Sequence, residues 1–113
     1  MDRAEREAPV SLWFSLDGEE SFSINITHNL TQMADVIGVY EALWHPERIK
    51  ATKAKDITAR VENALLRLRK APRRYGKFAD PAGWGTVPQF RKVLEEILVA
   101  CEKDPEAVIT AHG

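Results

Sequence analysis

Hydrophobic and polar residues alternate along VSLWFSLDGEESFSINI, residues 10–26. An apolar residue at every second position is typical of a strand that buries one of its faces. The residues on the two predicted buried faces are Val10, Leu12, Phe14 and Leu16 in the first run, and Phe22, Ile24 and Ile26 in the second. Asp17-Gly18 separates the runs, and glycine tolerates the positive φ that tight hairpin turns require. The pattern predicts a β-hairpin, with Trp13 on the face away from the core.

After residue 29 the apolar residues recur every three or four positions, which is typical of amphipathic helices. Three helices are predicted: residues 30–44, residues 47–70, and a third between Thr86 and Asp104. Prolines follow His45 and Ala71. They end the first two helices, because the residue before a proline avoids the helical region. The sequence AVITA, residues 107–111, predicts a short last strand.

Two of these helices begin with a capping signal. Asn29 is a good N-cap for the first, with Gln32 three positions later, and Thr86 and Gln89 repeat this spacing in the third. In such a capping box each side chain accepts a hydrogen bond from an unpaired backbone N–H at the helix start. Gly38 weakens the middle of the first helix or lets another element come close.

The element order predicts an α+β fold. An N-terminal β-hairpin, three helices and a short C-terminal strand would pack as helices on a small antiparallel sheet that the last strand completes. A chain of 113 residues is the size of one domain. We therefore expect a flexible, charged N-terminus over residues 1–9 and a single α+β domain over residues 10–113.

The composition is that of a globular protein, with 44% hydrophobic and 29% charged residues. The charged N-terminus offers no secretory signal, and no stretch approaches the roughly 18 apolar residues of a membrane span. Cys101 is the one cysteine, which excludes an internal disulfide and fits a reducing cytoplasm. It falls on the apolar stripe of the third helix, so we expect a buried hydrophobic residue and not a nucleophile.

The charge is unevenly distributed along the chain. The net charge is −1, yet residues 46–77 carry eleven Lys and Arg against three acidic residues. A basic segment of this kind can attract partners that bear phosphate, or it can simply face water or acidic neighbours. The basic residues are scattered around the second helix, no nucleic-acid-reading motif occurs, and the pI is near 6.3. These features argue against binding to duplex nucleic acid.

Helices that run up, down and up would bring three segments to one end of the molecule: THN at 27–29, RKAPRRYGK at 69–77 and GWGT at 83–86. Helix N-termini attract anions, glycines let a ligand approach the backbone, and a tryptophan ring can stack on a planar group. The predicted ligand-binding residues are Thr27, His28, Asn29, Arg73, Arg74, Lys77, Trp84, Gly85 and Thr86. The alternative is that the caps only finish their helices and that Trp84 packs in the core.

Support for catalysis or metal binding is slight. His28, His45 and His112 lack the spacing of metal ligands, so no metal ion or other cofactor is predicted. The adjacent acids Glu19-Glu20 fall in the hairpin loop and Glu95-Glu96 on a helix surface, and neither forms a convincing acid–base pair. No catalytic residue is assigned, although His28 remains a candidate general acid.

Three stretches together resemble a known group of proteins: ITHNLTQMADVIGVYEALWHPE, GWGT and ACEKDPEAVIT. They are similar to a family of small, mostly uncharacterised proteins encoded by bacteriophages and prophages, with ITxNL…MA…GxY…LWxP and GWG motifs. In that family an asparagine-bearing turn precedes GWG, whereas this chain has Phe78-Ala79-Asp80-Pro81-Ala82. The resemblance implies a phage accessory protein that acts in the cytoplasm of an infected bacterium.

Together these patterns lead to one principal hypothesis and two alternatives. The first is a non-enzymatic protein that binds a small phosphorylated or nucleotide-like ligand, for example to sequester a signal of host defence. The second is a protein–protein interaction module that docks to or inhibits a host protein through exposed Trp13 and Trp44 or through the basic helix. The third is an enzyme that uses His28. Exposed tryptophans would also fit a homo-oligomer.

Overall fold

The computed structural model describes residues 11–79, 83 and 85–112, so the expected flexible terminus at 1–9 lies outside the described residues. Strands β1 (Ser11–Asp17) and β2 (Ser21–Thr27) form the predicted hairpin. Strand β3 (Val108–His112) pairs antiparallel with the other side of β1, which gives the order β2-β1-β3. The predicted α+β fold, with a three-stranded antiparallel sheet completed by the last strand, is therefore confirmed.

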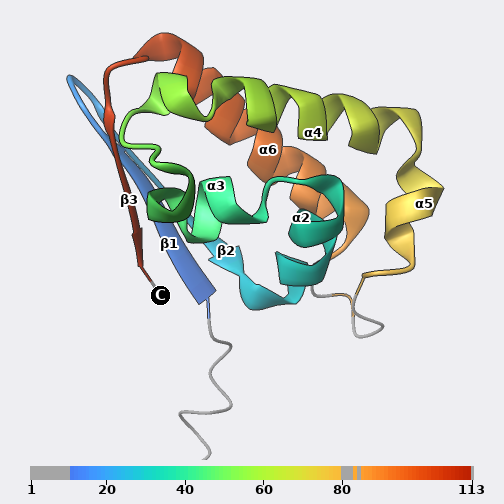
Figure 1. Cartoon of the computed structure of the whole chain (residues 1–113). Coiled ribbons are helices and arrows are strands. Elements are labelled where there is room, and N and C mark those ends of the chain that lie inside the picture. The colour runs from blue at the N-terminus through green and yellow to red at the C-terminus, as the bar shows by residue number, and fades with distance from the viewer. Residues whose placement is uncertain (1–10, 80–82, 84, 113) are drawn as a thin grey trace, which may run out of the picture.

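The helices all pack on one side of the sheet (Figure 1). The longer ones are α2 (Thr31–Ile37), α4 (Thr58–Lys70) and α6 (Val87–Lys103), and the short ones are α3 (Tyr40–Trp44) and α5 (Pro72–Gly76). Phe14 at the centre of β1 is fully buried together with Phe90 and Leu94 of α6. Trp13 points the other way and is 49% exposed, as the alternating pattern predicts. The sheet therefore has one covered and one open face.

The predicted single helix at 30–44 is wrong in detail, because it is broken at Gly38. This residue has a φ of +95°, and its N–H bonds to the Ala34 carbonyl, so it ends α2. A short 3-10 helix, His28–Leu30, precedes α2. Its cap is Thr27, whose Oγ1 accepts the Asn29 N–H at 3.3 Å, and not the predicted Asn29.

The predicted helix at 47–70 is also wrong in its first half, since α4 begins only at Thr58. Two 3-10 turns, Pro46–Ile49 and Ala54–Asp56, replace it. Asp56 Oδ2 accepts the N–H groups of Thr52 and Lys53, each at 3.0 Å. These bonds hold the pKa of Asp56 below its usual value. The segment thereby turns away from a helical course and runs beside β3.

The third predicted helix is confirmed as α6, with the Thr86 and Gln89 capping box in place. The hairpin turn was predicted correctly, but for the wrong physical reason. Gly18 does not have a positive φ, unlike Gly38, Gly83 and Gly85 among the described residues. Instead, a Cβ atom at Gly18 would occupy the space of the Asp104 carboxylate. The turn therefore packs directly on the C-terminal end of α6.

Candidate functional site

Two of the three segments predicted to share one end of the molecule do meet. A Cβ atom added to Gly85 would lie 3.0 Å from both the Asn29 carbonyl oxygen and the Asn29 Cβ. Gly85 is buried and has a φ of +82°. This glycine is therefore required by a close approach of protein backbone, which fills the space directly against its Cα. Trp84 lies outside the described residues.

The backbone amides at this corner are already hydrogen-bonded within the protein. Gln89 Oε1 accepts the N–H groups of Gly85 at 2.6 Å and Thr86 at 2.9 Å. Thr86 Oγ1 accepts the Gln89 N–H at 3.3 Å, and Thr27 Oγ1 holds that of Asn29. A ligand that used these amides would have to displace the caps, because each amide carries one proton to donate.

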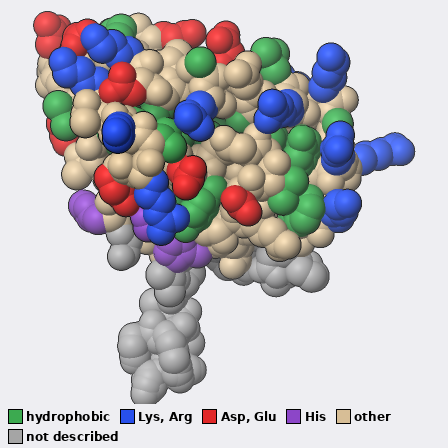
Figure 2. All heavy atoms as spheres, in the orientation of Figure 1, with side chains coloured by type: hydrophobic (Ala, Val, Ile, Leu, Met, Phe, Trp, Pro, Cys, Tyr) green, Lys and Arg blue, Asp and Glu red, His purple; other side chains and the backbone are tan. Residues whose placement is uncertain are grey.

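The predicted cations are on and just after α5. Arg73 and Arg74 lie on α5 and Lys77 follows it, and all three are exposed. The Lys77 ammonium lies 5.4 Å from the centre of the Phe78 ring. In Figure 2 the Lys and Arg side chains on the side where α5 lies have few acidic side chains near them, whereas those on the opposite side are mixed with Asp and Glu. Gly76 of α5 lies near the start of α6, since a Cβ atom there would be 3.9 Å from a side-chain carbon of Val87.

His28 has a structural partner. Its Nδ1 accepts the indole N–H of Trp44 at 3.0 Å, and the Trp44 ring stacks on Tyr40 with 5.4 Å between ring centres. Trp44 is only 6% exposed, so the expectation that it is an exposed anchor is wrong. The reason is that the break at Gly38 turns α3 so that Ala42, Leu43 and Trp44 are all buried. His28 therefore holds a buried indole in place.

Cys101 is fully buried, as predicted from its place on the apolar stripe. Burial raises the pKa of its thiol to about 11, which keeps the thiol protonated at neutral pH. Within the described residues, no group of three or more His, Cys, Asp or Glu is placed to hold a metal ion. Over the same part of the chain, no helix has the length and apolar character needed to cross a membrane.

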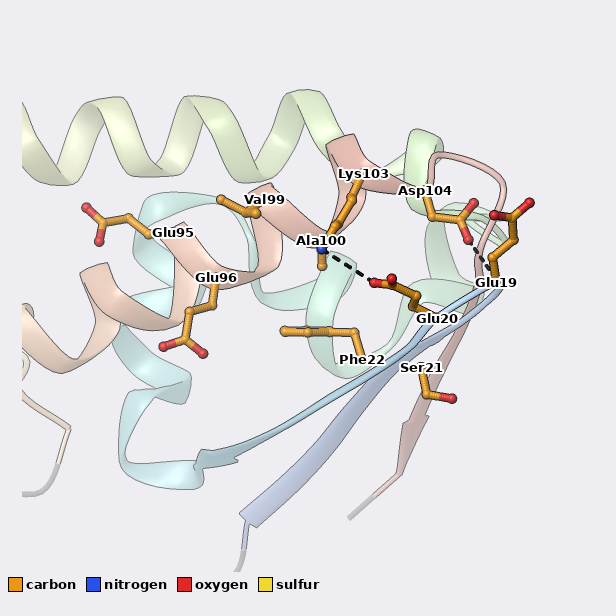
Figure 3. Close-up of a pocket in the computed structure, with 10 residues that line it drawn as sticks. All are labelled: Glu19, Glu20, Ser21, Phe22, Glu95, Glu96, Val99, Ala100, Lys103 and Asp104. Carbon is orange, nitrogen blue, oxygen red and sulfur yellow. Dashed lines mark hydrogen bonds and ion pairs between the residues drawn. The ribbon is translucent and has the colours of Figure 1, made fainter.

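A different region forms a large cavity, and none of the predicted site residues lines it. It measures about 630 Å³ and opens between the β1–β2 turn and α6. Its lining residues are Glu19, Glu20, Ser21, Phe22, Glu95, Glu96, Val99, Ala100, Lys103 and Asp104. Figure 3 shows Phe22 projecting from β2 toward α6, with acidic side chains around it. We call this cavity the β2–α6 groove.

The floor of the β2–α6 groove is apolar and its rim is acidic. Phe22, Val99 and Ala100 supply carbon surface, and Val99 is 62% exposed. Around them stand five carboxylates and a single ammonium group. Such a groove presents carbon surface inside a ring of negative charge.

Local ion pairs neutralise this negative charge only in part. Glu95 pairs with Arg69 at 2.8 Å, and Glu20 with Lys103 at 3.4 Å. All four side chains are substantially exposed, and ion pairs of this kind contribute little to stability. Asp104 accepts the Glu19 N–H at 3.0 Å, which joins the two walls at one end of the groove. The groove as a whole keeps an excess of negative charge.

The two acidic pairs that border this groove are visible in the sequence, but the sequence does not show that they lie near each other. Glu19-Glu20 and Glu95-Glu96 are both visible as acidic pairs, separated by about 75 residues of chain. Only the packing of the hairpin turn against α6 makes them opposite rims of one groove. Comparison of the chain with protein-family models, with curated proteins and with solved structures finds no match.

Proposed function

We propose that this chain is a non-catalytic interaction module whose β2–α6 groove binds a Lys- or Arg-rich segment of another protein. In line with the phage resemblance, the partner would be a protein of the bacterial host, met in its cytoplasm. The observation that carries this proposal is the apolar floor enclosed by an acidic rim. Protein interfaces commonly combine an apolar centre with a polar rim in this way.

The negative charge of the rim favours a positively charged partner. Basic side chains would be attracted by Glu19, Glu95 and Glu96, whereas an anionic ligand would be repelled from the same groove. Electrostatic complementarity raises association rates and rejects partners of like charge. The carbon surface of Phe22 and Val99 would stabilise the complex by about 25 cal/mol for each Å² of apolar surface that it buries. Binding should therefore weaken as salt rises, without vanishing.

The test is a binding titration with a defined probe, fluorescein-labelled Lys-Val-Lys-Val-Lys-Val-Lys amide. Val99→Asn should weaken binding at least about tenfold, or about 1.4 kcal/mol, because it removes carbon surface from the floor without changing the charge of the rim. Val36→Asn is the matched control, because Val36 is similarly exposed at 48% but lies on α2, outside the groove. Glu96→Lys should likewise weaken binding, while Glu102→Lys on the same helix should not. Equal effects of groove and control variants would contradict the proposal.

The anionic-ligand hypothesis stands as a second candidate, supported by the exposed Arg73, Arg74 and Lys77 on or just after α5. Helix α5 ends beside the first turn of α6, at the corner that Gly85 and Asn29 form. We propose that a small phosphorylated or nucleotide-like ligand would be held at this corner chiefly by Arg73, Arg74 and Lys77. A thermal-shift screen with nucleotides and cyclic dinucleotides tests it, since a ligand at 100 times its Kd adds about 2.7 kcal/mol.

The matched variants for that screen are a double charge reversal and a control on another helix. Arg73→Glu with Arg74→Glu should abolish the shift, and Arg91→Glu, exposed on α6, should not. The absence of any shift with the wild-type chain would count against this candidate. Recovery of the nucleotide intact after denaturation would separate binding from turnover by an enzyme.

A further inference from the structure

The two edges of the sheet differ in how they are covered. The outer edge of β3 is paired with residues 52–54: the Ile109 N–H bonds to the Thr52 carbonyl at 2.9 Å, and Lys53 bridges to Val108. For β2, the backbone hydrogen bonds among the described residues all go to β1. Among the described residues, the outer edge of β3 is paired only at Val108 and Ile109, whereas the outer edge of β2 is open along its whole length.

The sequence of this edge strand also carries none of the charges or prolines that usually guard against pairing. Strand β2 reads SFSINIT over seven residues, with no charged residue and no proline. Edge strands are commonly guarded by charges, prolines, bulges or a covering segment, because their unpaired N–H and C=O groups can pair with another chain. In an antiparallel pair, alternate residues of an edge strand turn these groups outward. Seven unguarded residues are long enough to pair with a short peptide strand.

The open edge borders the β2–α6 groove. Ser21 and Phe22 of β2 line the groove opposite Glu96 and Val99 of α6 (Figure 3). A strand laid beside β2 would turn every second side chain toward α6, because side chains alternate between the faces of a sheet. Those side chains would reach the apolar floor and the acidic rim together.

We infer that the partner segment binds as an added β-strand along β2, with Lys or Arg side chains directed at the carboxylates of the groove. This inference rests on the proposed function and specifies how the groove is used. In strand addition, main-chain hydrogen bonds supply affinity and the pockets for alternate side chains supply specificity. The β2 edge would supply the hydrogen bonds, and the rim of the groove would select the charge.

A second copy of this chain fits the edge less well. Pairing of β2 with β2 about a two-fold axis would bring the same surface of both copies together. Such a pair is antiparallel, so full pairing would set the Ser21 end of each β2, where the acidic groove lies, beside the Thr27 end of the other copy. The sequence around that end, residues 25–35, has no Lys or Arg to meet the carboxylates. A cationic strand from another protein supplies those charges, so the charges favour a foreign partner.

The experiment compares three probes on the wild-type chain. The first is the Lys-Val-Lys-Val-Lys-Val-Lys amide. The second and third are the same peptide with alternate backbone nitrogens methylated, so that each of them blocks one edge of the strand. Hydrogen exchange followed by mass spectrometry reports on the amides of 21–27. The unmodified peptide should slow exchange in this segment at least about tenfold, and methylation of one edge should weaken binding at least about tenfold.

Each outcome bears on a different statement. Binding that depends on Val99 but leaves exchange over 21–27 unchanged, and that tolerates methylation of either edge, overturns strand addition and keeps the proposed function. Failure of every peptide to bind overturns both. Concentration-dependent protection of 21–27 in the protein alone, at neutral pH, overturns the choice of a foreign partner in favour of a second copy. Protection by the unmodified peptide, lost on methylation, supports the inference.

Discussion

Replacing Gly85 with alanine should destabilise the fold more than the same change at Gly83. Both glycines have a positive φ, +82° and +91°, so an alanine at either position adopts an unfavourable backbone conformation. Their surroundings differ. A Cβ atom at Gly83 would have nothing within 4 Å, whereas at Gly85 it would lie 3.0 Å from the Asn29 carbonyl oxygen. The pair of variants thus separates backbone strain from close packing.

The surroundings of the two glycines determine how much more stability Gly85→Ala should lose than Gly83→Ala. The left-handed conformation costs an alanine roughly 1–2 kcal/mol, and Gly83→Ala should lose about that much free energy of unfolding. Gly85→Ala adds an overpacking cost of about 1–3 kcal/mol, because the neighbouring Asn29 carbonyl and Cβ are fixed by the backbone and cannot rotate away. The expected gap of about 1–3 kcal/mol corresponds to a difference in Tm of roughly 4–12 °C, at about 4 °C per kcal/mol.

Urea unfolding at 25 °C, followed by far-UV circular dichroism, measures this gap. Each midpoint should fall with the slope unchanged, which shows that stability and not the denatured state was altered. Equal losses in the two variants, or a larger loss at Gly83, would refute the close contact between the Gly85 segment and Asn29. The contact matters for function, since it joins the two segments of the candidate anion site.

Gly18→Ala should destabilise the fold by about 1–3 kcal/mol in the same urea assay, because its Cβ would displace the Asp104 carboxylate. Gly76→Ala, whose Cβ would meet nothing closer than 3.9 Å, should leave stability unchanged or raise it slightly, and a comparable loss there would contradict this account. Thr86→Ala should lose about 1 kcal/mol with its capping bond, and Thr86→Ser should retain most of it. Burial raises the thiol pKa of Cys101 from 9.0 to about 11, so the unfolded chain ionises first and stability should fall by up to about 2–3 kcal/mol as pH rises from 9 to 11. Cys101→Val should remove that part of the alkaline loss, and identical pH profiles would count against it.

The strands were predictable because their signal is local. Leu12, Phe14 and Leu16 alternate with polar residues, and a pleated strand sends alternate side chains to opposite faces whatever its neighbours are. The same holds for α6, whose capping box and apolar stripe are contained within its own seventeen residues. Where one element carries its own information, the sequence was sufficient.

The bounds of the other helices depend on single residues with left-handed backbone conformations, which the spacing of apolar residues does not reveal. Gly38 takes a left-handed conformation that ends α2, and Lys50 has a φ of 58° that turns the chain before α4. Ile49 and Ile57 keep helical spacing across that turn, so the pattern suggested a continuous helix. The chain there is instead held by Asp56 and by pairing with β3, which are interactions beyond the reach of a periodicity argument.

Part of the candidate anion site follows from chain direction alone. The approach of Asn29 and Gly85 was foreseen from the course of the helices. The groove was not foreseen, because its rims come from a hairpin turn and a distant helix whose separation is set by the packing of Gly18 against Asp104. Acidic pairs in a sequence do not predict a groove until the fold shows that they lie on its two sides.

The placement of β3 has a consequence for how the chain folds during synthesis. Phe14 of β1 pairs with Ala111 of β3, so the middle strand of the sheet gains its second neighbour only after residue 112 has left the ribosome. Until then both outer edges of the hairpin are unpaired. Pairing β3 with β1 closes the long loop of chain between them, which is slow compared with forming local helices. A chaperone could therefore bind in that interval, on the side of β1 that β3 covers in the finished protein.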